Sequence, residues 1–325
     1  MLLIREIVGR FLLALILIAS VAALNFLLLH AAPGDIVETI VGEMGGATEE
    51  TVRELRHQFG LDRPFVEQFF LYIGRTLTGD LGISAYYNRP VAGLILDRVP
   101  ATVLLVFTSL AIALVLGVIL GVISARFSRS WFAAVVNVVA LLGFSAPVFW
   151  SGLLLLLMFA IIVPLVPTSG MYDVAAGLSG WAFALDVLHH LILPATTLAL
   201  IYLALYTRLT RASMLEVMNS DYIRTARAKG LHEGKVLFKH GLRNALMPVV
   251  TMAGLQLSGM LAGAVLVETV FTWPGLGLLA YDAISRRDNQ LILGILVASA
   301  VLVIVGTILT DLLYRLIDPR VGARS

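Results

Sequence analysis

The chain has 325 residues, of which 59% are hydrophobic and 14% charged, and its formal net charge is +2. Its mean hydropathy of +0.94 is far above that of soluble globular domains, so lipid is the expected solvent for most of the chain. The basic residues form no aromatic-interleaved patch, and we expect no nucleic-acid partner. The absence of cysteine excludes disulfides, thiolate metal sites and a cysteine nucleophile.

Six long windows contain no Asp, Glu, Lys or Arg. A helix that crosses the ~30 Å hydrocarbon core needs about 20 apolar residues, because each residue advances a helix by about 1.5 Å. The windows are residues 11–29, 99–125, 132–166, 187–207, 245–267 and 291–310. They predict an all-α integral membrane protein with six transmembrane helices. The third window contains Pro147 and Pro164, so a bent span with an interfacial segment is expected there.

The basic residues predict the orientation, since short cytoplasmic loops carry an excess of Lys and Arg. With both termini inside, fifteen of the 23 basic residues lie on the cytoplasmic side. The predicted parts are the N-terminus and first span at 1–30, an outer segment at 31–98 and a five-helix core at 99–325, which includes a cytoplasmic loop at 208–243.

The outer segment, residues 31–98, is too polar to span a membrane. Its sequence predicts two short amphipathic helices. Thr48 is a good N-cap, and Glu49 and Glu50 suit the first turn of a helix. Pro64 opens a second helix that continues through Leu77. We expect a small cap on the outer ends of the spans, with direct solute contact as the alternative.

The loop at 208–243 is the most basic part of the chain and is strongly helical. No Pro or Gly occurs from Arg211 to Lys229, Gly230 supplies a helix stop with positive φ, and residues 231–243 can form a second short helix. An ordinary connection needs only a few residues, so a docking partner explains this length better than connection alone. Anionic lipid headgroups are the alternative partner for its charge.

This loop resembles that of a known family. DYIRTARAKGL at 221–231 and HGLRNALMPVV at 240–250 resemble the cytoplasmic signature of the permease subunits of ATP-binding-cassette (ABC) importers, in the dipeptide, oligopeptide and nickel branch. Arg224 stands where the general family pattern has Glu, and Thr225 and Ala226 take the places of two Ala, which is typical of the peptide branch. Six further runs are similar to that branch: APGD at 32–35, FGLDRPFVEQFFLYI at 59–73, GDLG at 79–82, ETVFTWPGLGLL at 268–279, AISRRD at 283–288 and DPR at 318–320.

The resemblance implies a type I importer permease fold and one half of a translocation path for peptides or a related solute across the inner membrane. It implies four partners: a second, similar membrane subunit, two ATPases that hold ATP and Mg²⁺, and an external solute-binding protein. The chain itself is then the first of the membrane pair, has no catalytic residue and binds no cofactor or metal. The sequence is consistent with ATP being held by the ATPases, because Gly234-Lys235 lacks the upstream Gly and the following Ser or Thr of a phosphate-binding loop.

The resemblance implies the first of three groups of candidate site residues, and their position at a span end suggests the other two. The residues expected to couple to the ATPases are Asp221, Tyr222, Arg224, Thr225, Ala226, Lys229, Gly230 and Leu231. The candidates for contact with the binding protein are Trp273, Pro274, Gly275, Leu276 and Gly277, with a re-entrant turn packed between spans as the alternative. Glu268, at a span end, is a candidate residue of the pathway, with a structural carboxylate as the alternative.

Two other functions compete with this interpretation. A self-sufficient secondary carrier needs ionisable residues within its spans, and the six windows contain no Asp, Glu, Lys or Arg. An intramembrane hydrolase needs a catalytic motif, but Ser145 lacks the G-x-S-x-G elbow and His189-His190 lacks the H-E-x-x-H spacing, so both are expected to be structural. The solute stays open among peptides, metal chelates, opines and sugars.

Overall fold

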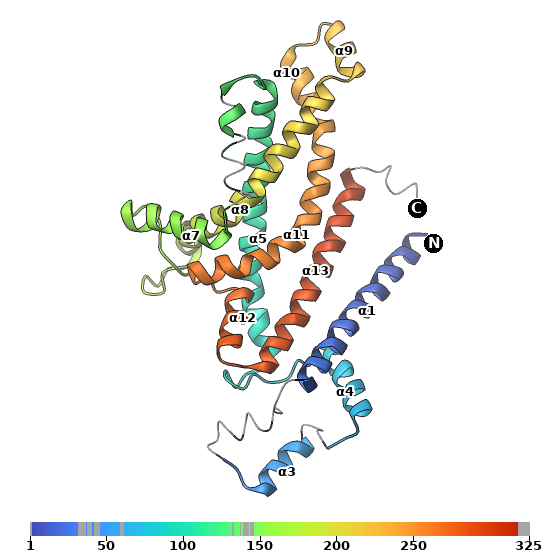
Figure 1. Cartoon of the computed structure of the whole chain (residues 1–325), viewed down its shortest axis with the longest axis vertical. Helices are drawn as coiled ribbons and strands as arrows, with labels where there is room; N and C mark the ends of the chain where they lie inside the picture. The colour runs from blue at the N-terminus through green and yellow to red at the C-terminus, as the bar shows by residue number, and fades with distance from the viewer. Residues whose placement is uncertain are drawn as a thin grey trace. The chain divides into compact units, whose positions relative to one another are not determined.

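The computed structural model describes residues 2–31, 37, 41, 46–58, 62–131, 133–136, 138, 143 and 146–317. Regular structure in these residues is helical, apart from one isolated antiparallel bridge between Ile83 and Pro90. The helices are α1 (Leu2–Ala31), α3 (Glu49–Gln58), α4 (Phe65–Leu77), α5 (Val91–Arg126), α7 (Val148–Leu156), the π-helix η1 (Leu157–Ile162), α8 (Gly180–Met218), α9 (Asp221–Ala228), α10 (Glu233–Lys235), the π-helix η2 (Val236–Leu242), α11 (Arg243–Phe271), α12 (Leu276–Ser285) and α13 (Asn289–Ile317) (Figure 1).

Three helices in the described part of the chain are long and apolar enough to cross a membrane: α5, α8 and the stretch Asn289–Thr310 of α13. A fourth is added if the bent α11 counts, with the helical residues before it, as one span. Shorter apolar helices cover Leu12–Leu28, Val148–Ile162 and Leu276–Ser285. The number of crossings and their orientation therefore stay predictions.

Prolines mark the break expected in the third window. Pro147 is the N-cap of α7, with φ −59° and ψ 138°, and its carbonyl accepts a hydrogen bond from the Ser151 amide at 3.1 Å. The helical run ends before Pro164, where Val163 is no longer helical at φ −119° and ψ 87°, as expected for a residue that precedes proline. Part of the window before Pro147, including Ser145, lies outside the described residues.

The chain divides into two compact units, Met1–Arg98 with Ala280–Ile304, and Val99–Leu279 with Val305–Ser325. In the second unit, α5 and α8 cross where α5 has two glycines. A Cβ added to Gly117 would lie 2.7 Å from the Cβ of Tyr206, and one added to Gly121 would lie 2.5 Å from the Cβ of Thr210. This Gly-x-x-x-Gly spacing places both glycines on one face of α5 and lets the two backbones approach closely, which is a main source of helix association in lipid.

The first unit contains both helices expected in the outer segment. α3 begins after Thr48, whose Oγ1 accepts a hydrogen bond from the Thr51 amide at 3.3 Å, and α4 begins after Pro64, so both predicted starts are confirmed. The buried carboxylate of Asp288 accepts hydrogen bonds from Ser84 Oγ at 2.5 Å and from the Leu291 amide at 3.1 Å. These bonds hold the turn that follows α4 against the start of α13.

Candidate functional site

Residues 219–242, here named the coupling element, connect α8 to α11 and lie beyond the ends of these two helices (Figure 1). The prediction of one helix from Arg211 to Lys229 is wrong, because α8 ends at Met218 and α9 begins at Asp221. Asn219 Nδ2 donates to the Leu215 carbonyl at 2.9 Å, and Ser220 Oγ donates to the Val217 carbonyl at 2.6 Å. Short polar side chains that bond to nearby backbone in this way compete with helix continuation.

The turn at Gly230 has the predicted conformation. Gly230 has φ +74°, the left-handed region that glycine adopts without steric cost. Its amide donates to the Arg227 carbonyl at 2.9 Å, and the Leu231 amide donates to the Ala226 carbonyl at 3.4 Å. These two bonds form a Schellman motif, and the contact of Leu231 with the cluster around Ala226 is the apolar contact that usually accompanies it. The motif fixes where the chain leaves α9.

A small apolar cluster fills the inside of the coupling element. Ile223 and Val236 are fully buried, Ala226 is 7% exposed, and Val217, Met218 and Leu231 pack against them. Ala226 therefore faces the element's own core, where a larger side chain would separate α9 from η2. The small side chain matters here because it sets the shape of the element.

The other predicted coupling residues lie on the exposed side of the element. Tyr222 is 43% exposed, and its hydroxyl accepts a hydrogen bond from Asn244 Nδ2 at 2.8 Å. Asp221, Arg224, Thr225 and Lys229 are also exposed. The sequence interpretation missed Phe238, which is 62% exposed in η2, although an aromatic residue within a basic loop was a visible signal. Two exposed aromatic rings among charged side chains are typical of a protein-binding surface.

The coupling element is attached to both neighbouring helices. η2 continues into α11 without a break in helical backbone. Leu237 packs in one cluster with Met214 of α8 and Ala245 of α11. A Cβ added to Gly241 would lie 3.0 Å from the Met218 sulfur, so η2 and the end of α8 are in close contact. Displacement of the element must therefore move the ends of α8 and α11.

The second unit also contains a buried polar site around Glu268, whose side chain is fully buried. Its Oε2 accepts hydrogen bonds from the amides of Gly277 at 2.6 Å and Leu278 at 3.1 Å, and its Oε1 accepts one from Thr102 Oγ1 at 2.7 Å. Thr102 Oγ1 in turn accepts from the Leu276 amide at 2.8 Å. These three amides are the first of α12 and have no acceptor within the helix, so Glu268 and Thr102 cap α12.

The turn before α12 packs around this carboxylate. A Cβ on Gly275 would lie 2.3 Å from Glu268 Cδ, and one on Gly277 would lie 2.4 Å from Val265 Cα, so neither position has room for a side chain. Trp273 is fully buried, and its indole N–H donates to the Ala101 carbonyl at 2.9 Å. Leu276 is 5% exposed and Pro274 is partly buried. Contact of this run with a binding protein stays a prediction.

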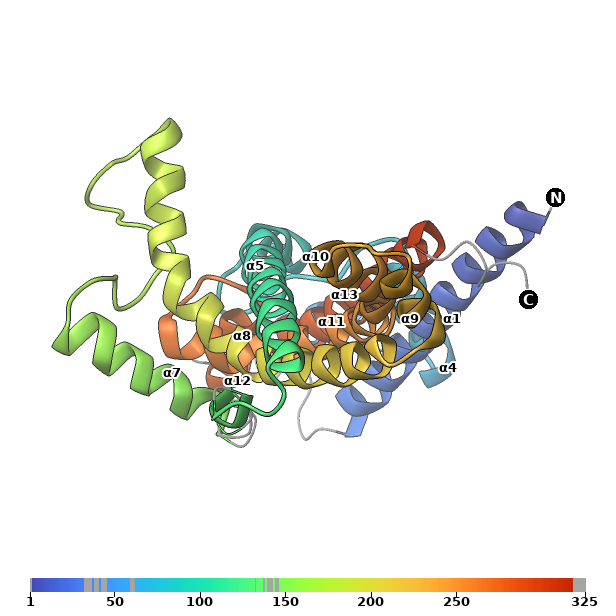
Figure 2. The ribbon, with the colours of Figure 1, turned by 90° about the horizontal axis from the view of Figure 1, so that it is seen from above.

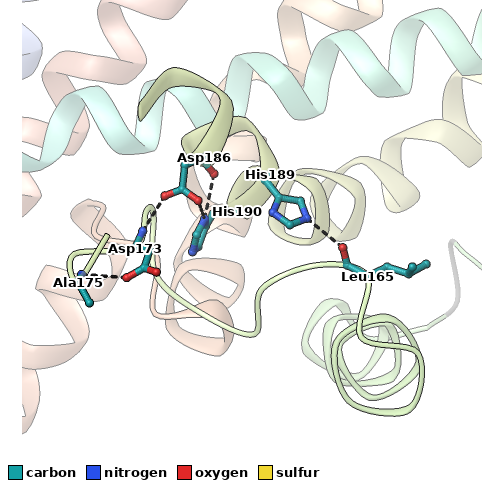
Figure 3. Close-up of polar contacts among 6 residues, drawn as sticks. All are labelled: Leu165, Asp173, Ala175, Asp186, His189 and His190. Carbon is teal, nitrogen blue, oxygen red and sulfur yellow. Dashed lines mark hydrogen bonds and ion pairs between the residues drawn. The ribbon is translucent and has the colours of Figure 1, made fainter. Parts of the chain in front are cut away.

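His189 and His190 each have a backbone partner in the second unit. His189 Nε2 lies 2.9 Å from the Leu165 carbonyl oxygen, and His190 Nδ1 lies 2.9 Å from that of Asp186 and 3.4 Å from Asp186 Oδ1. The Asp186 carboxylate also accepts the Asp173 amide at 2.7 Å. Figure 3 shows the two imidazoles pointing to different partners. His189 and the Asp186 carboxylate tie the start of α8 to the loop before it, whereas the contacts of His190 lie within α8.

Two family matches cover nearly the whole chain. Residues 117–323 match the family described as binding-protein-dependent transport system inner membrane component, and residues 2–106 match the N-terminal family of the same membrane component. The chain belongs to this family. The larger match contains the coupling element, Glu268 and α12, whereas Thr102 lies in the smaller one. The chain is therefore an integral membrane permease subunit that works with other subunits of a transport system.

Known relatives and a solved structure support the same family and fold. Oligopeptide transport system permease protein AppB of Bacillus subtilis (strain 168) is 39% identical over 317 residues, 97% of this chain and 98% of the relative. Dipeptide transport system permease protein DppB of Escherichia coli (strain K12) is 39% identical over 319 residues, 93% of this chain and 94% of the relative. The inward-facing MetNI methionine ABC transporter is similar in fold, with a TM-score of 0.53, 19% identity, and 69% of this chain and 96% of that chain covered. The predicted type I importer permease fold is confirmed.

Proposed function

We propose that this chain is the first of two membrane subunits of an ATP-driven importer that carries peptides across the inner membrane. The observation that carries the proposal is the 39% identity to an oligopeptide permease over 97% of the chain. The fold supports it independently, because the described helices include several that are long and apolar enough to span a membrane. In this proposal the chain crosses the membrane several times with both termini in the cytoplasm.

The proposed partners are a second, similar membrane subunit, two ATPases and an external solute-binding protein. ATP and Mg²⁺ belong to the ATPases, and this chain contributes no catalytic group and binds no cofactor or metal. The exposed side of the coupling element, with Tyr222 and Phe238 among charged residues, is the surface proposed to contact an ATPase.

The proposed mechanism follows from the attachments of the coupling element. Closure of the two ATPases on ATP displaces the element, and the continuous backbone from η2 into α11 transmits the displacement. The Schellman motif at Gly230 and the cluster around Ala226 keep α9 and η2 at a fixed angle, so the element moves as one body. Two packed arrangements of the spans, open to opposite sides, then alternate as the ATPases close and separate.

In this mechanism Glu268 supports the outer turn and has no direct role in solute binding. Its two carboxylate oxygens accept three hydrogen bonds from the chain itself, and the side chain is fully buried. The carboxylate therefore stabilises the position of α12, which leaves recognition of the solute to the external binding protein.

The proposal is tested with the complete transporter, purified from cells that express this chain with its neighbouring transport genes and reconstituted in vesicles. We expect uptake of a labelled dipeptide that requires ATP, the ATPases and the binding protein. Uptake by this chain alone, driven by an ion gradient, would establish a secondary carrier. ATP-dependent uptake of nickel chelates or sugars, with no uptake of peptides, would refute the peptide class while leaving the importer in place.

Variants of the coupling element test the mechanism in the same vesicles. Gly230→Val requires a β-branched residue at φ +74°, and Ala226→Trp adds bulk inside the element's core. Both are expected to abolish uptake and solute-stimulated ATP hydrolysis while the chain still inserts in the membrane. Arg224→Ala and Lys229→Ala are the matched controls, since exposed ion pairs contribute about 0–1 kcal/mol. Normal uptake by both core variants would show that this element is not the coupling site.

A further inference from the structure

Helix α4 of the first unit has one side packed against α1. Phe26 of α1 lies among three rings of α4, with centroid distances of 5.1 Å to Phe65, 5.4 Å to Phe69 and 5.8 Å to Tyr72. His30 adds a polar contact, with its Nε2 3.2 Å from the side-chain oxygen of Gln68. Figures 1 and 2 both show α4 beside α1. This side accounts for only part of the apolar surface of the helix.

A second apolar side of α4 has no cover in the described part of the chain. Val66 is 63% exposed, Phe70 is 66% exposed and Leu77 is 44% exposed. They are spaced by four and seven residues, which places them on one side of a helix with 3.6 residues per turn, beside the side that faces α1. We name these three residues the α4 stripe. The neighbouring flank carries the charged side chains, with Glu67 Oε1 2.7 Å from Arg63 Nη1 and Arg75 exposed, and Leu71, which is 40% exposed, lies between them.

We infer that the α4 stripe lies in the lipid at the outer boundary of the membrane, so that α4 is an interfacial helix lying along the bilayer surface. The inference rests on the membrane placement and orientation of α1 in the proposed function and is independent of which solute is carried. A helix with one apolar flank and one charged flank suits this position, since the first enters the acyl boundary and the second stays with headgroups and water.

Continuity with α1 identifies lipid as the occupant of the stripe. The last turns of α1, on which α4 packs, expose Leu24 (57%), Leu27 (52%) and Leu28 (51%), as expected for a helix surrounded by acyl chains. The stripe extends this exposed apolar surface onto α4 at the end of the proposed span. Phe65 and Tyr72 also place aromatic rings there, and aromatic side chains concentrate at the interface between membrane and water.

The absence of cysteine makes a direct test simple, because a single introduced cysteine carries the only label. Phe70→Cys and Val66→Cys report on the stripe, and Glu67→Cys and Arg75→Cys on the polar flank serve as matched controls. Each full-length variant is spin-labelled within the complete transporter, in vesicles of phosphatidylethanolamine and phosphatidylglycerol. Collision rates are then measured with oxygen, which concentrates in lipid, and with a water-soluble nickel chelate.

We expect labels at 66 and 70 to collide more with oxygen than with the nickel chelate, and labels at 67 and 75 to show the reverse. Frequent nickel collisions at 66 and 70 would place the stripe in water and overturn the inference. Few collisions with either reagent would show that a protein subunit covers it, which also overturns it. Peptide uptake is assayed on the same vesicles, so loss of uptake with an unchanged collision pattern separates failure of the proposed function from failure of the inference.

Discussion

Replacing Glu268 by alanine would leave three hydrogen-bond donors without their acceptor: the buried Thr102 Oγ1 and Gly277 amide, and the partly buried Leu278 amide. A buried donor without a partner costs about 1–3 kcal/mol, so we expect a loss of unfolding free energy of roughly 3–6 kcal/mol after partial relaxation. Glu268→Gln keeps one carbonyl oxygen for the two amides, but its NH2 group cannot accept the bond that Thr102 Oγ1 donates, so we expect a smaller loss of roughly 1–3 kcal/mol.

The assay is unfolding of the purified subunit in detergent micelles, followed by a spectroscopic probe as a denaturing detergent is added. The expected order of stability is wild type, then Glu268→Gln, then Glu268→Ala. Thr102→Val is the partner variant, because it removes the hydroxyl that donates to Glu268 and accepts from the Leu276 amide. The double variant Thr102→Val with Glu268→Ala should lose less unfolding free energy than the sum of the two single variants. Each single variant already removes the hydrogen bond between Thr102 and Glu268.

Two results would refute this reasoning. Additive losses, within about 0.3–0.5 kcal/mol, would mean that Glu268 and Thr102 are not energetically coupled. An equal loss of unfolding free energy in Glu268→Gln and Glu268→Ala would mean that the negative charge stabilises the protein and that the hydrogen bonds capping α12 do not. A role of Glu268 in the solute pathway would instead predict variants of normal stability with altered uptake of particular solutes.

Three further predictions concern topology and packing. Cysteines at Ser220 and Glu50 should react with an impermeant reagent from opposite sides of the membrane, and labelling of both from outside intact cells would contradict the orientation. Gly121→Val should prevent the α5–α8 contact and lower the yield of folded protein, because a Cβ there lies 2.5 Å from that of Thr210, whereas Gly93→Ala, with no atom within 4 Å, should match wild type. Tyr222→Phe removes the bond from Asn244 and should lower thermal stability by about 0.5–1.5 kcal/mol, and an unchanged melting curve would argue against that bond.

Local rules in the sequence predicted a large part of this fold. Pro64 and Pro147 each precede a helix, because proline fixes its own φ and disfavours helical backbone at the preceding residue. Gly230 has the predicted positive φ, because a left-handed residue after a helix is normally glycine. Five of the six uncharged windows lie within helices, and the described part of the third is helical except beside Pro147 and from Val163 onward, since an apolar stretch in lipid must satisfy its backbone hydrogen bonds internally.

Other features depend on contacts between distant parts of the chain. Thr102 caps α12 together with Glu268, which is 166 residues further along, and no local pattern relates a hydroxyl near Pro100 to that carboxylate. The break at Asn219 and Ser220 was missed for another reason, since the surrounding residues are good helix formers and their local signal outweighs two short polar side chains.

Gly230 and Gly277 are required for different physical reasons, and substitution by asparagine distinguishes the two reasons. Gly230 has φ +74° with no atom within 4 Å of an added Cβ, so it is required for its backbone conformation, which asparagine also tolerates. Gly277 has no such φ, but an added Cβ would lie 2.4 Å from Val265 Cα, so it is required for space. We therefore expect Gly230→Asn to retain most uptake, at a cost of about 1 kcal/mol, and Gly277→Asn to lose folded protein in a thermal stability assay. Equal defects in both variants would contradict this distinction, because nothing around Gly230 excludes a side chain.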